Sequence, residues 1–147
     1  MKPATAGRLT ELLDRQLAAL ESVLEVLDRE RSGLEHRDTA ALESIAAEKQ
    51  ERLAAAAAFE QQRRELAPSP AAMESLAESP HFASRWARLL DLTRACRDHS
   101  EANGQIVRRG QHCMESTMSL RRGRSAKARV CGADGKARTA RVPISSA

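Results

Sequence analysis

Leucines recur every seven residues through the first quarter of the chain, at Leu13, Leu20, Leu27 and Leu34. Other apolar residues fall between them and widen the stripe: Leu9, Leu12, Leu17, Val23, Leu24 and Val26. Sustained heptad spacing is the pattern of a helix in a coiled-coil seam, and the wider stripe predicts contact with more than one neighbour. We therefore predict a first helix that begins at a cap on Thr5 and ends near Glu35.

A second helix is predicted soon after the first one ends. Gly33 weakens the end of the first helix, and Asp38 is a favourable N-cap for the next. The apolar side of this second helix consists of Leu42, Ile45, Leu53, Ala56, Phe59 and Leu66. Pro68-Ser69-Pro70 ends it. Because the connection is short, we expect the first two helices to form an antiparallel hairpin.

The segment from Phe82 to about Leu120 contains no proline and is predicted to form a long third helix, which starts at Ser79-Pro80. One side of it carries Phe82, Trp86, Leu89/Leu90, Thr93, Cys96, Ser100, Asn103, Ile106/Val107, Gly110, Met114 and Met118/Thr117. This side begins aromatic and leucine-rich, becomes small and polar, and ends rich in thioethers. A helix that only fills a core seldom weakens its stripe in this way. We therefore expect its first half to pack in a bundle and its second half to be available to a partner.

These segments predict an all-α fold, an elongated antiparallel three-helix bundle made of a helical hairpin plus a long third helix. Composition agrees, because charged residues make up 30% of the chain and aromatic residues only 2%. β-branched and aromatic residues are too few to build a sheet. We predict a helical body over residues 1–120, with a short helical piece near residues 71–78 before the third helix.

The remaining residues, 121–147, are predicted to form a flexible basic tail. From Arg121 onward there are eight Lys/Arg and one acid, Asp134, a net charge of +7. Because the whole chain carries +4, residues 1–120 carry −3. The tail has too little apolar surface to offset the entropy of ordering, although Ala133-Asp134-Gly135-Lys136 is a turn signal.

Several classes of protein are disfavoured by the sequence. No run of 18 apolar residues exists, so we expect no membrane insertion, and the N-terminus lacks the apolar core of a signal peptide. Three cysteines at unrelated spacings do not make a disulfide framework. We expect a reduced, cytoplasmic protein.

Enzymatic and metal-binding roles are also disfavoured. Cys96-x-x-His99 and His112-Cys113 look like ligand pairs, but within one helix they would lie about 25 Å apart along its axis. No phosphate-binding glycine loop or serine-centred elbow occurs. We expect no catalytic residues, no metal, no cofactor and no small-molecule substrate.

Asn103-Gly104 in the third helix has two interpretations, because both residues are poor in helix interiors. The pair could be a weak spot or a close helix crossing, or it could mark a hinge or the approach of a partner. Beyond it lie Ile106, Val107, Cys113, Met114 and Met118, which are adaptable apolar residues of the kind found on binding surfaces. Spacing alone allows these residues to be core equally well.

The chain resembles the FlgN family of flagellar export chaperones over most of its length. The resemblance rests on the leucines of the first helix followed by Glu30, and on Leu42, Ile45 and Glu48-Lys49 in the second. It also rests on Asn103-Gly104-Gln105-Ile106 and on Cys131-Gly132-Ala133-Asp134-Gly135 near the end. The last two motifs in combination are the more specific part.

The resemblance implies a cytoplasmic chaperone of type III flagellar secretion that binds hook-associated proteins. In this family the C-terminal part of the molecule holds the client's amphipathic C-terminal helix. Carried onto this chain, the client-binding residues are Asn103, Ile106, Val107, Gly110, Met114, Met118 and Leu120. Burial of one helix on another would need no ATP and no metal.

One departure from the family concerns docking to the export gate, which is associated with an aromatic residue in the tail. Where relatives commonly have a tyrosine before the Gly-Ala-Asp-Gly turn, this chain has Cys131. The other apolar tail residues that could replace it are Val130, Val142 and Ile144.

Two alternatives to a chaperone remain open. The heptad seam could dimerise with itself, which would make the chain a coiled-coil scaffold or adaptor. The basic tail could contact nucleic acid through counterion release. Against that second alternative, no aromatic is interleaved for base stacking, and the body is acidic.

Overall fold

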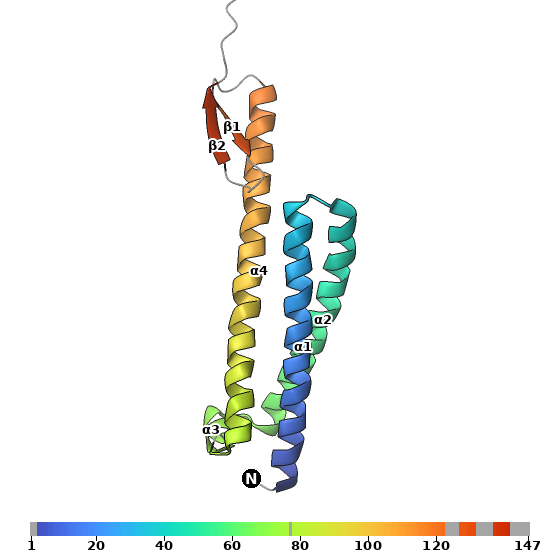
Figure 1. The fold of residues 1–147 in the computed structure, drawn as a ribbon, viewed down its shortest axis with the longest axis vertical. Coiled ribbons are helices and arrows are strands. Elements are labelled where there is room, and N and C mark those ends of the chain that lie inside the picture. The colour runs from blue at the N-terminus through green and yellow to red at the C-terminus, as the bar shows by residue number, and fades with distance from the viewer. Residues whose placement is uncertain (1–2, 77, 123–126, 132–136, 142–147) are drawn as a thin grey trace, which may run out of the picture.

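The computed structural model describes residues 3–76, 78–122, 127–131 and 137–141, the last two ranges as backbone only. Its helices are α1 (Pro3–Glu35), α2 (Thr39–Leu66), α3 (Pro70–Leu76) and α4 (Pro80–Arg121), shown in Figure 1. The all-α fold class is confirmed, and α2 and α4 begin at the predicted positions. The predicted cap at Thr5 is wrong, because α1 already begins at Pro3 and Thr5 lies inside it.

The ends of the helices follow local chemistry. Asp38 caps α2, since its side chain accepts a hydrogen bond from the Ala41 amide at 3.1 Å. Just before it, Arg37 has a positive φ of 53°, which turns the chain sharply between α1 and α2. Pro80 occupies the first turn of α4, where the missing N–H costs nothing. These signals place the α1–α2 turn at one end of the bundle and the start of α4 at the other.

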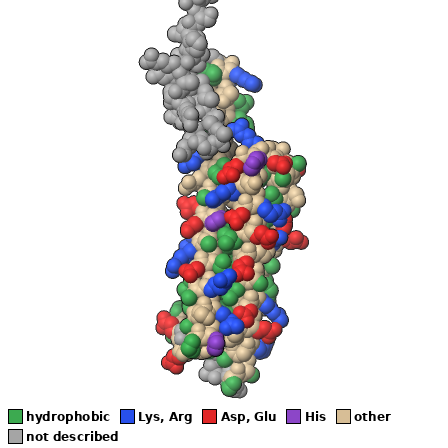
Figure 2. All heavy atoms as spheres, in the orientation of Figure 1, with side chains coloured by type: hydrophobic (Ala, Val, Ile, Leu, Met, Phe, Trp, Pro, Cys, Tyr) green, Lys and Arg blue, Asp and Glu red, His purple; other side chains and the backbone are tan. Residues whose placement is uncertain are grey.

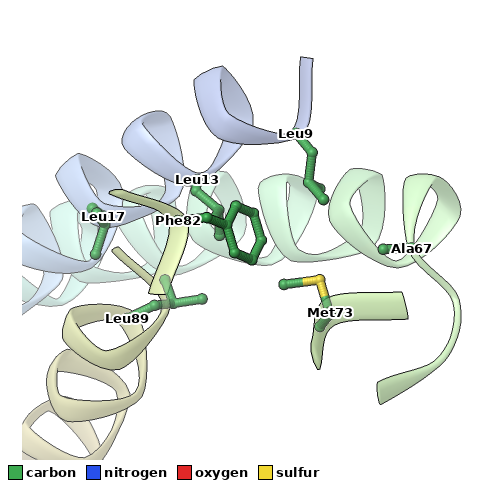
Figure 3. Close-up of a cluster of buried hydrophobic side chains, with 7 residues drawn as sticks. All are labelled: Leu9, Leu13, Leu17, Ala67, Met73, Phe82 and Leu89. Atoms are coloured by element: carbon green, nitrogen blue, oxygen red, sulfur yellow. The ribbon is translucent and has the colours of Figure 1, made fainter. Parts of the chain in front are cut away.

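α1 is the central helix of the bundle, in contact with both α2 and α4. α2 runs antiparallel to α1, and α4 returns parallel to it, so the three helices run up, down and up (Figure 1). Where α4 begins, α1, α3, α4 and the residue that follows α2 share one apolar cluster, drawn in Figure 3: Leu9, Leu13, Leu17, Ala67, Met73, Phe82 and Leu89. A second cluster higher in the bundle contains Val23, Leu27 and Ala56.

A buried polar contact joins α1 to α2 beside the first cluster. The Gln16 side-chain amide donates to Glu60 at 2.7 Å, and Arg63 donates to both carboxylate oxygens of Glu60. The Arg63 guanidinium also lies over the Trp86 ring, 5.0 Å from its centroid. Burial raises the pKa of Glu60, but hydrogen bonds from Arg63, Gln16 and Arg64 outweigh burial and hold that pKa below its ordinary value.

Polar contacts along the α1–α4 seam show the register of the two helices. Arg85 on α4 pairs with Asp14 on α1 at 2.6 Å, Arg88 pairs with Glu21, and His99 Nδ1 lies 3.0 Å from Asp28. The hydrogen-bonded partners across this seam are 67 to 76 residues apart in sequence. Glu35, the last residue of α1, is therefore level with about the Val107 turn of α4, and roughly 20 Å of α4 continues beyond it.

Two short strands follow α4, in a region where the sequence predicts no regular structure. β1 (Lys127–Cys131) pairs antiparallel with β2 (Ala137–Arg141), with Lys127 opposite Arg141 and Cys131 opposite Ala137. The predicted turn at Ala133-Asp134-Gly135-Lys136 lies outside the described residues. β1 also contacts α4, and this tertiary contact is one that the composition of the tail does not reveal. In Figure 1 the hairpin lies on the side of α4 away from α1 and α2.

The helices were compared with the length and apolar character of a membrane-spanning helix. Among the residues described by the structure, no helix combines the length and apolar character that a membrane span needs.

Candidate functional site

Asn103 lies at the level where α4 leaves the bundle. Its side chain is 2% exposed and donates to the backbone carbonyl of Leu27 and to Glu30 Oε2, each at 2.9 Å. Its carbonyl oxygen accepts from Arg31 Nε at 3.2 Å. Glu30 also pairs with Lys49 on α2, so one polar network joins α1, α2 and α4. The hydrogen-bonding groups of the Asn103 side chain are therefore already paired with residues of α1.

Gly104 does not interrupt the helix, because α4 is continuous through Asn103-Gly104. A Cβ at Gly104 would lie 3.3 Å from Nη1 of Arg108, so the glycine leaves room for that guanidinium to fold back. Asn103 therefore contacts α1, whereas the space beside Gly104 is taken by an arginine of its own helix.

The segment of α4 beyond Asn103 exposes large apolar side chains. Val107 is 42% exposed, Met118 53% and Met114 67%, whereas few large apolar residues elsewhere in the described helices are exposed to this extent. The core interpretation of these methionines is therefore wrong. Figure 2 shows hydrophobic and Lys/Arg side chains together on the part of α4 that rises beyond the α1–α2 turn.

The exposed residues continue the side of α4 that faces α1 lower in the bundle. Steps of four and three residues from Asn103 reach Val107, Gln111, Met114, Met118 and Arg121. We call these five residues after Asn103 the α4 stripe. At 3.6 residues per turn they lie along one face. α1 ends level with the beginning of this stripe. It covers α4 up to that level, and it does not cover the α4 stripe.

The remaining predicted client residues border the stripe. Ile106 and Leu120 are half-buried, while Gly110 is exposed, and a Cβ added to it would meet no atom within 4 Å. Of the seven predicted residues, Val107, Met114 and Met118 form the exposed apolar surface together. Gln111 and Arg121 were not predicted, although the heptad spacing from Val107 leads to both.

The cysteines differ in environment. Cys96 is a free, half-buried thiol whose Sγ lies 3.5 Å from the Leu20 carbonyl, and burial raises the pKa of that thiol. Cys113 is 5% exposed and disulfide-bonded, which corrects the expectation of a fully reduced protein. The tail residues predicted to dock at the export gate cannot be placed in the site. Val130 and Cys131 belong to β1, whose side chains are outside the description, and Val142 and Ile144 lie outside the described residues.

No constellation of catalytic or metal-binding groups accompanies the stripe within the described part of the chain. Those residues contain no group of three or more His, Cys, Asp or Glu side chains placed to hold a metal ion. His99 instead faces Asp28 across the α1–α4 seam, 3.0 Å away.

A comparison with protein families decides the class of this protein. The family described as "FlgN protein" matches residues 1–139. The chain belongs to the FlgN family. FlgN proteins are flagellar export chaperones, and the match covers the three-helix bundle, the α4 stripe and most of the β1–β2 hairpin. No curated protein and no solved structure gives a significant match to the chain.

Proposed function

We propose that this protein is a chaperone for hook-associated proteins, the proteins of the hook–filament junction. It binds the amphipathic helical segment at the C-terminus of its client, prevents aggregation of that segment, and keeps the client competent for type III export from the cytoplasm. Membership of the FlgN family supports the client class. The α4 stripe supports the mode of binding.

The observation that carries this proposal is the exposure of Val107, Met114 and Met118 along one face of a helix that has lost its neighbour. Burying an exposed aliphatic or thioether side chain of this size contributes about 1–2 kcal/mol. Together these side chains favour an apolar partner. Flexible methionines also adapt to more than one partner surface, which suits a chaperone with several related clients.

A helix fits this surface better than an extended strand. Below Val107, the same face of α4 is covered by the parallel helix α1, with partners at heptad spacing. A client helix would continue that packing above the α1–α2 turn, where α1 no longer covers α4. Gly110 at the border of the stripe has open space around it and permits close approach of the client backbone.

Delivery to the export gate is assigned to the tail of the chain. Val130 and Cys131 of β1, together with Val142 and Ile144, are the residues we propose for docking there. β1 contacts α4, so gate docking and client binding would occur at the same end of the molecule.

Co-purification with hook-associated proteins tests the proposal. We expect a one-to-one complex by light scattering with full-length client, and loss of the complex when the client's C-terminal helical segment is deleted. Equal binding of the deleted client would contradict the proposal. Concentration-dependent doubling of the chaperone's own mass, without any client binding, would favour the self-associating scaffold instead.

A further inference from the structure

Arginines without an ion-pair partner among the described side chains border the α4 stripe at both ends. Arg108 lies at its beginning, and Arg121 and Arg122 lie at its end. The ion pairs among described side chains join residues between Glu11 and His99, and none reaches these arginines. The one carboxylate of this part of α4 is Glu115, midway between them.

The positions of these groups follow one edge of the helix. Arg108, Glu115 and Arg122 are spaced by seven residues, so they line the same side of the stripe. Arg108 and Arg122 are separated by about 21 Å along the axis. The Arg108 guanidinium folds over Gly104, and Arg122 Nε donates to the Met118 carbonyl at 3.3 Å. Arg122 is thereby held beside the end of the stripe, while the Arg108 guanidinium lies beside Gly104, just before the stripe begins.

We propose that the α4 stripe selects an amphipathic helix whose apolar stretch carries a carboxylate at each end, about 20 Å apart. This inference rests on the proposed function and adds the charge pattern of the segment that is bound. Carboxylates at the two ends would pair with Arg108 and with Arg121 or Arg122. The middle of the segment, opposite Glu115, would be neutral or basic. Because the pattern is the same from both ends, either chain direction satisfies it.

Charge complementarity favours this occupant over two others. A second copy of the chain would bring the same arginines against one another if its stripe were the partner. An anionic membrane would attract the arginines but would be opposed by Glu115 in the middle of the edge. An acidic-ended helix pairs with the cations and avoids Glu115.

Three synthetic helical peptides of about 20 residues with identical apolar positions provide the test. The first has glutamates at both ends, the second has glutamines there, and the third has its glutamates moved to the middle. We expect the first to bind the full-length chain about three- to tenfold more tightly than the second, and the third to bind most weakly. The preference should disappear at high salt, because exposed charges are screened.

Variants of the protein identify the cations. Arg108→Gln with Arg122→Gln should abolish the preference for the first peptide, mainly through slower association. Arg109→Gln is the control for the Arg108 half of this change, because it removes one positive charge from the same turn, on the side of α4 away from the stripe. It should leave the preference unchanged.

Several outcomes would overturn the inference. Equal binding of the peptides, binding of none of them, or an equal loss in Arg109→Gln would each contradict it. Loss of binding to phosphatidylserine vesicles in the double variant, with peptide preference retained, would assign the arginines to a membrane instead. The proposed function would still hold in all these cases if hook-associated proteins bind the wild-type chain and bind less when the α4 stripe is altered.

Discussion

Asn103 on α4 donates a hydrogen bond to the backbone carbonyl of Leu27 on α1, with 2.9 Å between Nδ2 and the oxygen. The same amide nitrogen also reaches Glu30, and the side chain is almost fully buried. A buried amide with specific partners fixes the register of packed helices, because any slip leaves it unpaired. The Asn103–Leu27 contact therefore sets how much of α4 projects beyond α1.

Replacing Asn103 tests this role. Asn103→Ala removes the partner of Leu27 and Glu30 while keeping the helix, so we expect the free energy of unfolding to fall by about 2 kcal/mol. Urea denaturation followed by circular dichroism measures the change. Gln105→Ala, an exposed neighbour in α4, is the control and should change stability little. Equal stability of Asn103→Ala and wild type would show that the network does not hold α4.

Glu60 should make the stability of the bundle sensitive to acid. Its pKa is lowered in the folded state, so it stabilises the fold fully above its ordinary value of 4.5, and this contribution is lost as the pH falls through the folded value. Glu60→Gln should therefore be less stable than wild type at neutral pH and lose less stability on acidification. Urea midpoints at about pH 7 and about pH 3 give the comparison.

A matched variant separates this effect from general acid sensitivity. Glu43→Gln removes an exposed carboxylate from the same helix and should retain the acid response of wild type. If Glu60→Gln and Glu43→Gln respond to acid identically, the Gln16–Glu60–Arg63 contact does not contribute as described.

Gly110 offers a test of close approach by the client. Alanine fits there without contact and favours the helix by about 0.5–1 kcal/mol, so amide hydrogen exchange near it should slow in Gly110→Ala. We expect client affinity to fall nonetheless, because the added methyl group keeps the client backbone away. Gly7→Ala makes the same substitution in open space on α1, far from the stripe, and should leave both client affinity and exchange near Gly110 unaltered. Unchanged or tighter client binding by Gly110→Ala would remove Gly110 from the interface.

Much of the helical body could be predicted from sequence, because its signals are local. Asp38 and Pro80 mark helix starts through chemistry that involves only a few neighbouring residues. The leucine heptads likewise indicate the buried side of α1, where Leu13, Val23 and Leu27 are core residues. The first helix extends past the predicted cap because Pro3 tolerates a helix N-terminus.

The candidate site depended on longer-range geometry. The residues around Asn103 do not reveal that α1 ends about two turns beyond Leu27, so sequence alone could not separate the buried Asn103 from the exposed Met114. Asn103 is buried and Met114 is exposed because α1 reaches the level of Asn103 but ends before the level of Met114. The β1–β2 pairing was missed for a similar reason, since contact with α4 supplies packing that the tail composition lacks.

The central claim is that the α4 stripe binds the client, and Met114→Glu with Met118→Glu tests it most directly. Both side chains are exposed, so charges there should leave helical content nearly unchanged while disfavouring an apolar partner. Leu53→Glu is the control, because it places a charge on an exposed apolar site of α2, away from the stripe. We predict that calorimetric titration with a hook-associated protein shows at least about tenfold weaker binding for the methionine variant and wild-type affinity for Leu53→Glu. Wild-type affinity of the folded methionine variant would contradict the account.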